Sequence, residues 1–482
     1  MLTTASHQRL VPGAFEVPSC GWISRGRFSE YIFINSKEKS VSNLGIRKSA
    51  GNQHAHVEGV SSALLLDWAK EEGVSAPKVA QGMINGRRGL IALDSISEDE
   101  IFVGVPRSLA LVVDPLERCP CKEFISQSVY QKFPWDAKMA TLLLCEKRKG
   151  KDSRLYPYIN QLPTIDTPVR WSESEIDELQ SPSMKDIVLK QKQEWQEYYN
   201  EFRQACKGKD NDKESWDDFL WAMESVRSRT FSGPYAGSSL KERISMAAFL
   251  GVGGLLYAFI AHIPLQSIGN AAIAAASFNL MYDLILSSRL KWYGMCPVID
   301  GINHCGKITS DIQYEYFTNK FALTTNRSYK AGDELFISYK KANSLFVQYY
   351  GFVEEENPDD IYKLDVDIAG CPRTLSLQYD GQLAQSSLDE LSKDEELKVN
   401  VEKLDSGESK LSTVVRESLI SALEREISNK ATTLADDMRL LKNPGMIKDE
   451  RMELGVKFRI SQKKILERAL KAACIDANKQ TL

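Results

Sequence analysis

The chain has 482 residues, of which 43% are hydrophobic and 26% are charged, an ordinary globular composition with room for two to three domains of roughly 150 residues each. The formal net charge is −4 and no basic block is as large as a domain, which argues against nucleic acid as the main partner. The nine cysteines are scattered and the five histidines form no His-Glu-x-x-His pattern. We therefore predict reduced thiols in an intracellular compartment, with neither a disulfide framework nor a metal site.

Residues 1–57 form an N-terminal extension that lacks the apolar stretch of a secretory signal. Arginine and serine are mildly enriched in it. Two interpretations stay open: a transit peptide for an organelle such as the plastid, and a disordered tail.

The first folded segment is expected to contain one short helix followed by strands. Leu64 and Trp68 mark one face of a helix that stops at Gly73. Residues 86–92 (Gly-Arg-Arg-Gly-Leu-Ile-Ala) and the β-branched residues 101–105 then indicate strand, turn and strand.

A mainly helical insert is predicted over residues 115–295. Ser172 and Glu175 stand three residues apart ahead of an apolar pattern, which is typical of a helix that begins with a capping box. Residues 217–229 indicate another helix with one apolar side, formed by Phe219, Leu220, Met223 and Val226.

Within the insert, residues 244–282 contain no Asp, Glu, Lys or Arg. Pro264 divides this stretch into two arms of about 19 residues, each of which would span roughly 28 Å as a helix, close to the thickness of a bilayer. One hypothesis is a re-entrant or spanning hairpin that brings the protein to a membrane. The other is a hairpin buried against the protein's own core.

Strands are expected to return after the insert, at residues 314–317, 321–325 and 335–339. Residues 354–482 then form a separate C-terminal domain. One alternating strand is predicted there at residues 362–368, and the rest is expected to be helical because apolar residues recur at steps of four from Val415 to Ile427.

Three separated motifs suggest chemistry when they are taken together. They are residues 86–92, residues 300–304 (Asp-Gly-Ile-Asn-His) and residues 332–339 (Gly-Asp-Glu-Leu-Phe-Ile-Ser-Tyr), with Tyr350-Gly351-Phe352 just beyond. Each is weak alone, since a glycine-rich turn usually only connects strands. In this order, with strand-like sequence around each, they resemble the three signature segments of a SET domain.

The resemblance extends to the Rubisco large-subunit lysine methyltransferase family. Residues 219–222 (Phe-Leu-Trp-Ala), running into residues 227–232 (Arg-Ser-Arg-Thr-Phe-Ser), are similar to the helix that precedes the Asn-His motif in that family. The resemblance covers roughly residues 60–475 and is interrupted by residues 244–282. It implies an α+β fold: a small curved β-sheet SET core over residues 58–353, split by the helical insert, and an all-helical substrate-binding domain over residues 354–482.

The same resemblance implies S-adenosyl-L-methionine as cofactor. The residues that match its binding positions are Arg87, Arg88, Gly89, Asn303, His304 and Phe352. The family's turn usually has one bulky basic residue fewer than this chain, so either Arg87 or Arg88 is the residue directed inward. Arg229, Asp300 and Tyr314 match positions that line the cleft for the substrate or the cofactor's carboxylate, for which an arginine fork is well suited.

Tyr339 matches the catalytic tyrosine of the family. Methyl transfer from a sulfonium to an amine is an in-line displacement, so positioning supplies much of the acceleration. The attacking lysine must be neutral although its free pKa is about 10.4, and a dry channel beside a positive sulfonium favours deprotonation. A tyrosine hydroxyl at the end of that channel orients the amine without adding an acidic group.

The implied activity is protein-lysine N-methylation in the cytoplasm or a plastid. The substrate is expected to be a non-histone protein, because no cysteine cluster follows Tyr339 as it does in histone-type relatives. Two alternatives stay open. The same fold could methylate a protein histidine, since the shape of the cleft chooses the acceptor. A catalytically silent scaffold is the other, suggested by the large insert and by Gly233-Pro234, where the family tends to place a second arginine.

Overall fold

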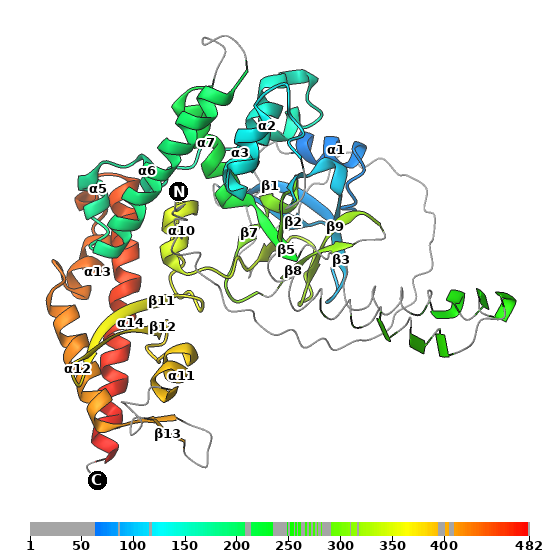
Figure 1. The fold of residues 1–482 in the computed structure, drawn as a ribbon. Helices are drawn as coiled ribbons and strands as arrows, with labels where there is room; N and C mark the ends of the chain where they lie inside the picture. Colours follow the sequence, from blue (N-terminus) through cyan, green and yellow to red (C-terminus); the bar gives the residue numbers. More distant parts are fainter. Residues whose placement is uncertain are drawn as a thin grey trace, which may run out of the picture. The chain divides into compact units, whose positions relative to one another are not determined.

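The computed structural model describes residues 63–84, 87–114, 118–207, 214–234, 291–308, 310–315, 318–393, 401–403 and 409–480, together with some helical residues between 248 and 281. The predicted extension over residues 1–57 lies outside these ranges, so both interpretations of it stay predictions. Helices and strands mix throughout the described chain, which confirms the α+β class (Figure 1).

Short strands from both ends of the predicted SET region form three small sheets in the described residues. The first has the order β1 (Val79–Ile84), β2 (Arg87–Ala92), β10 (Glu334–Ile337) and β7 (Asn303–His304); the second is β3 (Ile101–Pro106), β9 (Lys320–Thr325) and β8 (Ser310–Glu315); the third is β4 (Leu111–Val113), β6 (Lys291–Met295) and β5 (Phe231–Pro234). The strands expected at residues 101–105 and 321–325 are confirmed, and the one expected at 335–339 is β10, which ends at Ile337. β8 begins earlier than the predicted residues 314–317, of which 316 and 317 lie outside the described residues. Figure 1 shows the blue strands of the early chain beside the yellow-green strands that follow residue 300.

Helices fill most of the chain between the early and late strands. They are α1 (Ala63–Glu71), α2 (Gln127–Lys132), α3 (Trp135–Lys149), α4 (Tyr156–Ile159), α5 (Glu173–Asp177), α6 (Pro182–Ala205) and α7 (Trp216–Arg229), with single 3₁₀ turns η2 (Arg107–Leu109), η3 (Gly150–Asp152), η4 (Pro168–Arg170) and η7 (Ile299–Gly301). The capping box at Ser172 and Glu175 is present, and α7 buries the four apolar residues predicted for it. The insert over residues 115–295 is not helical to its end, because it contains β5 and β6, and β6 pairs with both β5 and β4.

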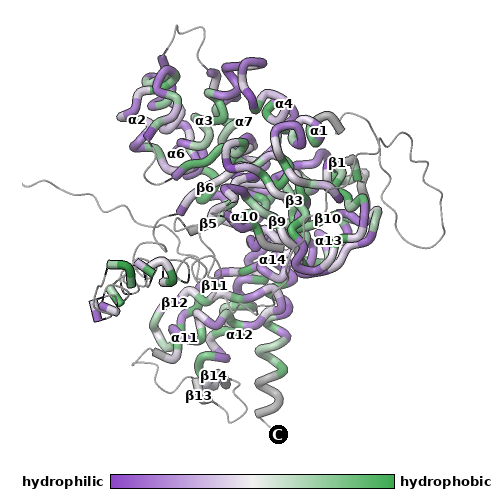
Figure 2. Tube along the Cα trace, turned by 90° about the vertical axis from the view of Figure 1, so that its right-hand side faces the viewer, coloured by the Kyte–Doolittle hydropathy of each residue, from purple (hydrophilic) through white to green (hydrophobic). Residues whose placement is uncertain are grey.

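β5 ends at Pro234 and β6 begins at Lys291, and these two residues lie opposite each other in the antiparallel pair. The segment that contains residues 244–282 therefore begins and ends at the same place in the third sheet. The described residues within the stretch are helical, and Figure 2 shows hydrophobic residues among paler and hydrophilic ones along them. Their side chains face solvent: Val252 is 60% exposed and Phe259 is 83% exposed. The alternative of a hairpin buried against the core is therefore wrong for the described residues. None of the described helices combines the length and the apolar character that crossing a bilayer requires.

The C-terminal region is mainly helical, but it is not all-helical as predicted. Its elements are α10 (Asn343–Tyr350), β11 (Ile361–Ile368), β12 (Cys371–Gln378), α11 (Gln385–Lys393), β13 (Val401–Lys403), β14 (Ser409–Leu411), α12 (Thr413–Ser428), α13 (Leu434–Lys442), the turn η8 (Pro444–Met446) and α14 (Glu450–Gln480). The predicted strand at residues 362–368 is β11. It pairs along its whole length with β12, because its alternate residues Leu364, Val366 and Ile368 need a buried face.

The described chain has two main apolar cores and a smaller one between them. One core joins the strands of the three small sheets to α3 and α7, and the second joins β11 and β12 to α12 and α14. The third core connects the helical insert and α10 with the beginning of α14; its buried members are Trp171, Ile176, Leu179, Met184, Val188, Val347, Leu454 and Phe458. Burial of these apolar groups couples the C-terminal helix to the insert.

An ion-pair network lies beside this third core. Arg451 at the start of α14 donates to both oxygens of Asp166, one at 2.6 Å and the other at 2.9 Å, and to Glu175 at 3.0 Å. Glu175 also accepts from the backbone N–H of Ser172 at 2.7 Å. The Ser172 backbone and hydroxyl, then Arg451, lower the pKa of Glu175 to about 2.

The lowered pKa of Glu175 predicts how acid weakens the ion-pair network around Arg451. Glu175 stabilises the fold fully above its ordinary pKa of about 4.5, and this contribution is lost as the pH falls toward about 2. Glu175→Gln keeps the capping geometry but removes the charge, so it should lower the melting temperature at pH 7 by roughly 1–3 °C, as expected for an exposed pair. Melting curves at pH 7 and near pH 2 measure the difference, which should shrink at the lower pH. Glu173→Gln in the same turn, with a 72% exposed side chain, is the control and should change little. An equal loss at both pH values would contradict the assignment.

Candidate active site

The central strand β10 brings the three sequence motifs together. On one edge it pairs antiparallel with β2, where Leu335 lies opposite Leu90. On the other edge it pairs parallel with β7, where Phe336 lies opposite Asn303. The glycine-rich turn, the Asn-His pair and the segment that ends at Tyr339 therefore meet in one sheet.

Asn303 connects two of these segments through its side-chain amide. The Nδ2 group donates to the carbonyl oxygen of Arg88 at 3.0 Å and to Oε1 of Glu334 at 2.8 Å. Gly89 lies directly beneath this contact, and a Cβ atom there would meet Asn303 Nδ2 at 2.9 Å and Glu334 Oε1 at 3.0 Å. Close approach of the backbone to Asn303 thus requires glycine at this position.

His304 is held in one tautomer by its two neighbours. The backbone N–H of Tyr339 donates to Nδ1 at 3.1 Å, so Nε2 carries the proton and donates to Glu354 Oε2 at 2.9 Å. The backbone N–H of Gly306 donates to the other oxygen of Glu354 at 2.8 Å. Burial opposes ionisation of Glu354, but the bonds from His304 and Gly306 outweigh it and lower the pKa of Glu354.

Tyr339 is fixed at both its backbone and its hydroxyl. The hydroxyl donates to the carbonyl oxygen of Ile302 at 2.7 Å, and the ring centroid lies 4.9 Å from that of His304. Burial raises the pKa of Tyr339 to about 12, with Asp300 acting in the same direction and Arg229 against it. The hydroxyl therefore keeps its proton at neutral pH.

Aromatic rings surround His304 and Tyr339. Phe346 stacks on Phe352 with centroids 4.6 Å apart, and His304 lies 4.6 Å from Phe346 and 5.9 Å from Phe352. Tyr350 lies 5.2 Å from Tyr339. The Tyr-Gly-Phe segment thus supplies a flat apolar wall, as its position after the third motif suggests.

Arg229, Asp300 and Tyr158 form a buried polar group next to Tyr339. Arg229 Nη1 lies 3.0 Å from the Asp300 carbonyl oxygen and 3.6 Å from its Oδ2, and the Tyr158 hydroxyl donates to the same Oδ2. Burial raises the pKa of Asp300, while Arg229 and Tyr158 work against this shift. The Nε of Arg229 is buried and has no hydrogen-bond partner among the described residues.

Arg88, and not Arg87, is the arginine directed toward this group. Burial and Arg229 lower the pKa of Arg88, and Asp300 partly compensates. Its Nη1 also donates to the carbonyl oxygen of Gln161 at 2.8 Å. Both arginines are exposed, and Arg87 lies opposite Ile84 at the start of β2.

Tyr314 lies in a different set of contacts from the one proposed for it. Its hydroxyl donates to Asn319 at 2.6 Å, and its ring packs 5.2 Å from Phe321 and 6.3 Å from Trp292. The guanidinium of Arg107 lies 5.7 Å from the ring centroid. These contacts connect β8 to β9 and β6.

Sequence reasoning missed three residues that organise the site: Tyr158, Glu334 and Glu354. Tyr158 and Asp300 are 142 positions apart, and no local sequence pattern predicts their contact. Glu334 belongs to the third motif, so its contact with Asn303 follows once the strands are paired. Among the described residues, no group of three or more His, Cys, Asp or Glu side chains is arranged to hold a metal ion.

No protein-family model matches the chain. Its curated relatives include the actin-histidine N-methyltransferases of Rattus norvegicus, at 24% identity, and Homo sapiens, at 23%. Both alignments run over 462 residues and cover 86% of this chain and 68% of the relative.

The alignments with solved structures cover a larger share of both chains. A structure of Rubisco LSMT bound to AdoMet is 19% identical, with a TM-score of 0.58, and covers 88% of this chain and 93% of that chain. The SET domain of LSMT bound to MeLysine and AdoHcy is 20% identical, also with a TM-score of 0.58 and the same coverage. The chain therefore has the SET-domain fold of Rubisco LSMT, which confirms at the level of the fold the resemblance seen in the sequence.

Gly89 gives a direct test of how tightly the motifs pack. Gly89→Ala should destabilise the protein by about 1–3 kcal/mol, because the new methyl group would displace Asn303 and Glu334. Gly104→Ala on β3 is the matched control, since its Cβ would meet nothing closer than Ser75 Cβ at 3.8 Å and should cost less than about 1 kcal/mol. Chemical denaturation measures both. Equal effects of the two changes would mean that Asn303 does not sit against Gly89.

Proposed function

We propose that this protein is an S-adenosylmethionine-dependent protein N-methyltransferase of the SET type. The observation that carries the proposal is the placement of Tyr339, whose protonated hydroxyl is anchored on Ile302 and whose backbone is tied to His304. This arrangement lies where the three motifs meet, on a fold shared with Rubisco LSMT.

The residues around Tyr339 fit the cofactor's chemical parts. The unpartnered Nε of Arg229, with Arg88 beside it, suits a carboxylate. The backbone near Arg88 and Asn303 supplies polar groups, and Phe352 with His304 offers an aromatic face for adenine. When bound, S-adenosylmethionine supplies an electrophilic methyl group on a positive sulfur. Rubisco LSMT, with this fold, has been solved bound to AdoMet.

The chain's own residues prepare the acceptor nitrogen for an in-line attack. Tyr339 presents a neutral hydroxyl, because its pKa of about 12 keeps the proton in place, and so it orients the nitrogen without adding negative charge. Burial of the cleft strips water from the acceptor, and Arg229 adds positive charge nearby. Both effects favour a neutral, nucleophilic amine. Positioning then supplies much of the acceleration.

Two acceptors are supported by different observations. The fold of the LSMT structures, one of which is bound to MeLysine, supports the target lysine that the sequence suggests. The curated relatives are named actin-histidine N-methyltransferases, and this supports a protein histidine as the second candidate. We place the lysine activity first because 88% of the chain follows the LSMT fold. A catalytically silent scaffold is disfavoured by the complete hydrogen bonding of His304 and Tyr339.

We also propose a cytoplasmic or plastid location. Membrane contact through residues 244–282 is part of this proposal, and the exposed apolar residues there, such as Phe259 and Ile260, support it.

Transfer of labelled methyl from S-adenosylmethionine into host-cell proteins tests the activity. The wild-type chain should label a protein band, and Tyr339→Phe should reduce the rate about 10²-fold or more by leaving the acceptor unoriented. Tyr329→Phe is the matched control, because the hydroxyl of this buried tyrosine bonds to the backbone of Phe336 among the described residues, and the activity of this variant should stay near that of the wild type. Acid hydrolysis of the labelled band then separates methyllysine from methylhistidine. No labelling by the wild-type chain would support the scaffold and sink the proposal.

Cofactor binding has its own test at Arg229. Arg229→Lys keeps the charge but loses the planar fork, so S-adenosylmethionine should bind about tenfold or more weakly in calorimetric titration. Arg227→Lys, two residues earlier on the same helix and paired with Asp136, is the control and should bind as the wild type does. If both variants bind equally well, Arg229 does not receive the carboxylate.

A further inference from the structure

One short segment joins the candidate active site to α14. Residues 352–356, here called the wall segment, follow α10 and form neither helix nor strand. Two of their side chains face the site. The ring centroid of Phe352 lies 5.9 Å from that of His304, and Glu354 accepts from Nε2 of His304 at 2.9 Å. The wall segment thus carries the aromatic face proposed for adenine and helps to hold His304 in one tautomer.

Two other side chains of the wall segment contact α14. Val353 packs against the third core, to which α14 also contributes. Glu356 accepts from Nζ of Lys464 at 3.1 Å and from Nη2 of Arg468 at 3.0 Å and 2.8 Å. Burial opposes ionisation of Glu356, but the bonds from Arg468 and Lys464 outweigh it and lower the pKa of Glu356. Neighbouring residues of one segment therefore contact the site and the C-terminal helix in turn.

A further contact holds the chain where the wall segment begins. Gly351 ends α10 in the left-handed region, with a φ of 71°. A Cβ atom there would meet the backbone carbonyl oxygen of Asp166 at 3.1 Å. The carboxylate of the same Asp166 accepts from Arg451 at 2.6 Å and 2.9 Å. The helix α14 therefore acts at both ends of the wall segment, through Asp166 at its start and through Glu356 at its end.

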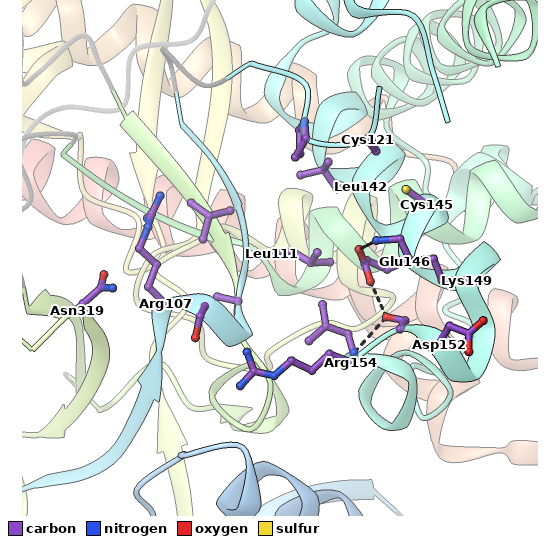
Figure 3. Close-up of a pocket in the computed structure, with 16 residues that line it drawn as sticks. Arg107, Leu111, Cys121, Leu142, Cys145, Glu146, Lys149, Asp152, Arg154 and Asn319 are labelled. Carbon is purple, nitrogen blue, oxygen red and sulfur yellow. Dashed lines mark hydrogen bonds and ion pairs between the residues drawn. The ribbon is translucent and has the colours of Figure 1, made fainter. Parts of the chain in front are cut away.

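The wall segment takes no part in the cavity of about 640 Å³ that Figure 3 shows. Its lining includes Arg107, Leu111, Cys121, Leu142 and Lys149, and none of the residues proposed to hold the cofactor. The volume is within the range of small-molecule sites, roughly 300–1,000 Å³. A test of the wall segment must therefore distinguish the proposed cofactor site from this cavity.

We propose that Lys464 and Arg468 are positioning residues for the cofactor, because through Glu356 they hold the wall segment against His304. This rests on the proposed function, since the wall concerned is the one assigned to adenine. The side chains of Arg468 and Glu356 are 37% and 46% exposed, and such a pair contributes little to overall stability. Loss of the pair therefore leaves the fold intact and releases the wall segment. The hydroxyl of Tyr339 is anchored elsewhere, on Ile302.

Charge reversal at Glu356 tests the coupling. Glu356→Lys places a third cation beside Lys464 and Arg468 and so repels the end of the wall segment. The KM for S-adenosylmethionine should rise about fivefold, the size of one exposed ion pair, while kcat stays within about twofold of the wild type. The double variant Glu356→Lys with Arg468→Glu restores one pair of opposite charges and should recover most of the affinity. A rise in KM without this rescue would contradict the assignment.

Two control variants match the lost charge at other places. Lys457 is paired with Glu453 within α14, and their side chains are 43% and 41% exposed. Lys457→Glu should therefore bind S-adenosylmethionine as the wild type does. Lys149→Glu changes the lining of the cavity and should also leave the affinity unchanged. If Lys149→Glu weakens binding as much as Glu356→Lys does, the cofactor occupies the cavity and the proposal is overturned.

Hydrogen–deuterium exchange of the cofactor-free chain separates this proposal from the proposed function. The backbone N–H of Gly306 donates to Glu354 at 2.8 Å. A peptide that covers residues 303–308 should therefore exchange faster in Glu356→Lys than in the wild type or in Lys457→Glu. If the wild type binds no S-adenosylmethionine, the proposed function fails and this proposal fails with it. If the wild type is active and Glu356→Lys matches it in both exchange and KM, only the role of α14 is wrong.

Discussion

The pairing of β10 on both of its edges is the constraint on which the rest of the site depends. One edge holds β2, with its glycine at position 89, and the other holds β7, with Asn303 and His304. Because successive side chains of a strand point to opposite faces, a shift of the pairing by one residue would turn every side chain to the opposite face. Asn303 stabilises the observed register, because only in this register does its amide donate both to the backbone of Arg88 and to the carboxylate of Glu334.

From this sheet a chain of hydrogen bonds fixes Tyr339. Glu354 accepts from His304, His304 accepts from the Tyr339 backbone, and the Tyr339 hydroxyl donates to Ile302. Lys340 follows directly in a left-handed conformation with φ of 49°. A non-glycine residue in this region is unusual and persists where its surroundings determine it. The chain turns sharply there, and α10 then places Tyr350 and Phe352 against His304 and Tyr339.

Much of this could be anticipated from local sequence, and the remainder depends on distant contacts. Residues 86–92, 300–304 and 332–339 carry their own strand and turn signals, and in this order they resemble the signature segments of a SET domain, which indicates one site. Tyr158 and Glu354 could not be found this way, because their partners are far away in the sequence. β12 was missed because Pro372 and polar residues weaken its pattern, and β11 needs that partner for its buried face. Tyr314 was assigned to the cleft by resemblance, but its contacts lie with Asn319, Phe321 and Trp292.

Hydrogen–deuterium exchange of the full chain, with and without S-adenosylmethionine, tests most directly whether the three motifs form one cofactor site. We expect the cofactor to slow exchange together in peptides that cover residues 87–92, 300–304 and 339–352. The β11–β12 hairpin, with a core of its own, should be unchanged. Protection of only one motif, or of the hairpin instead, would contradict the assembly of the site around β10.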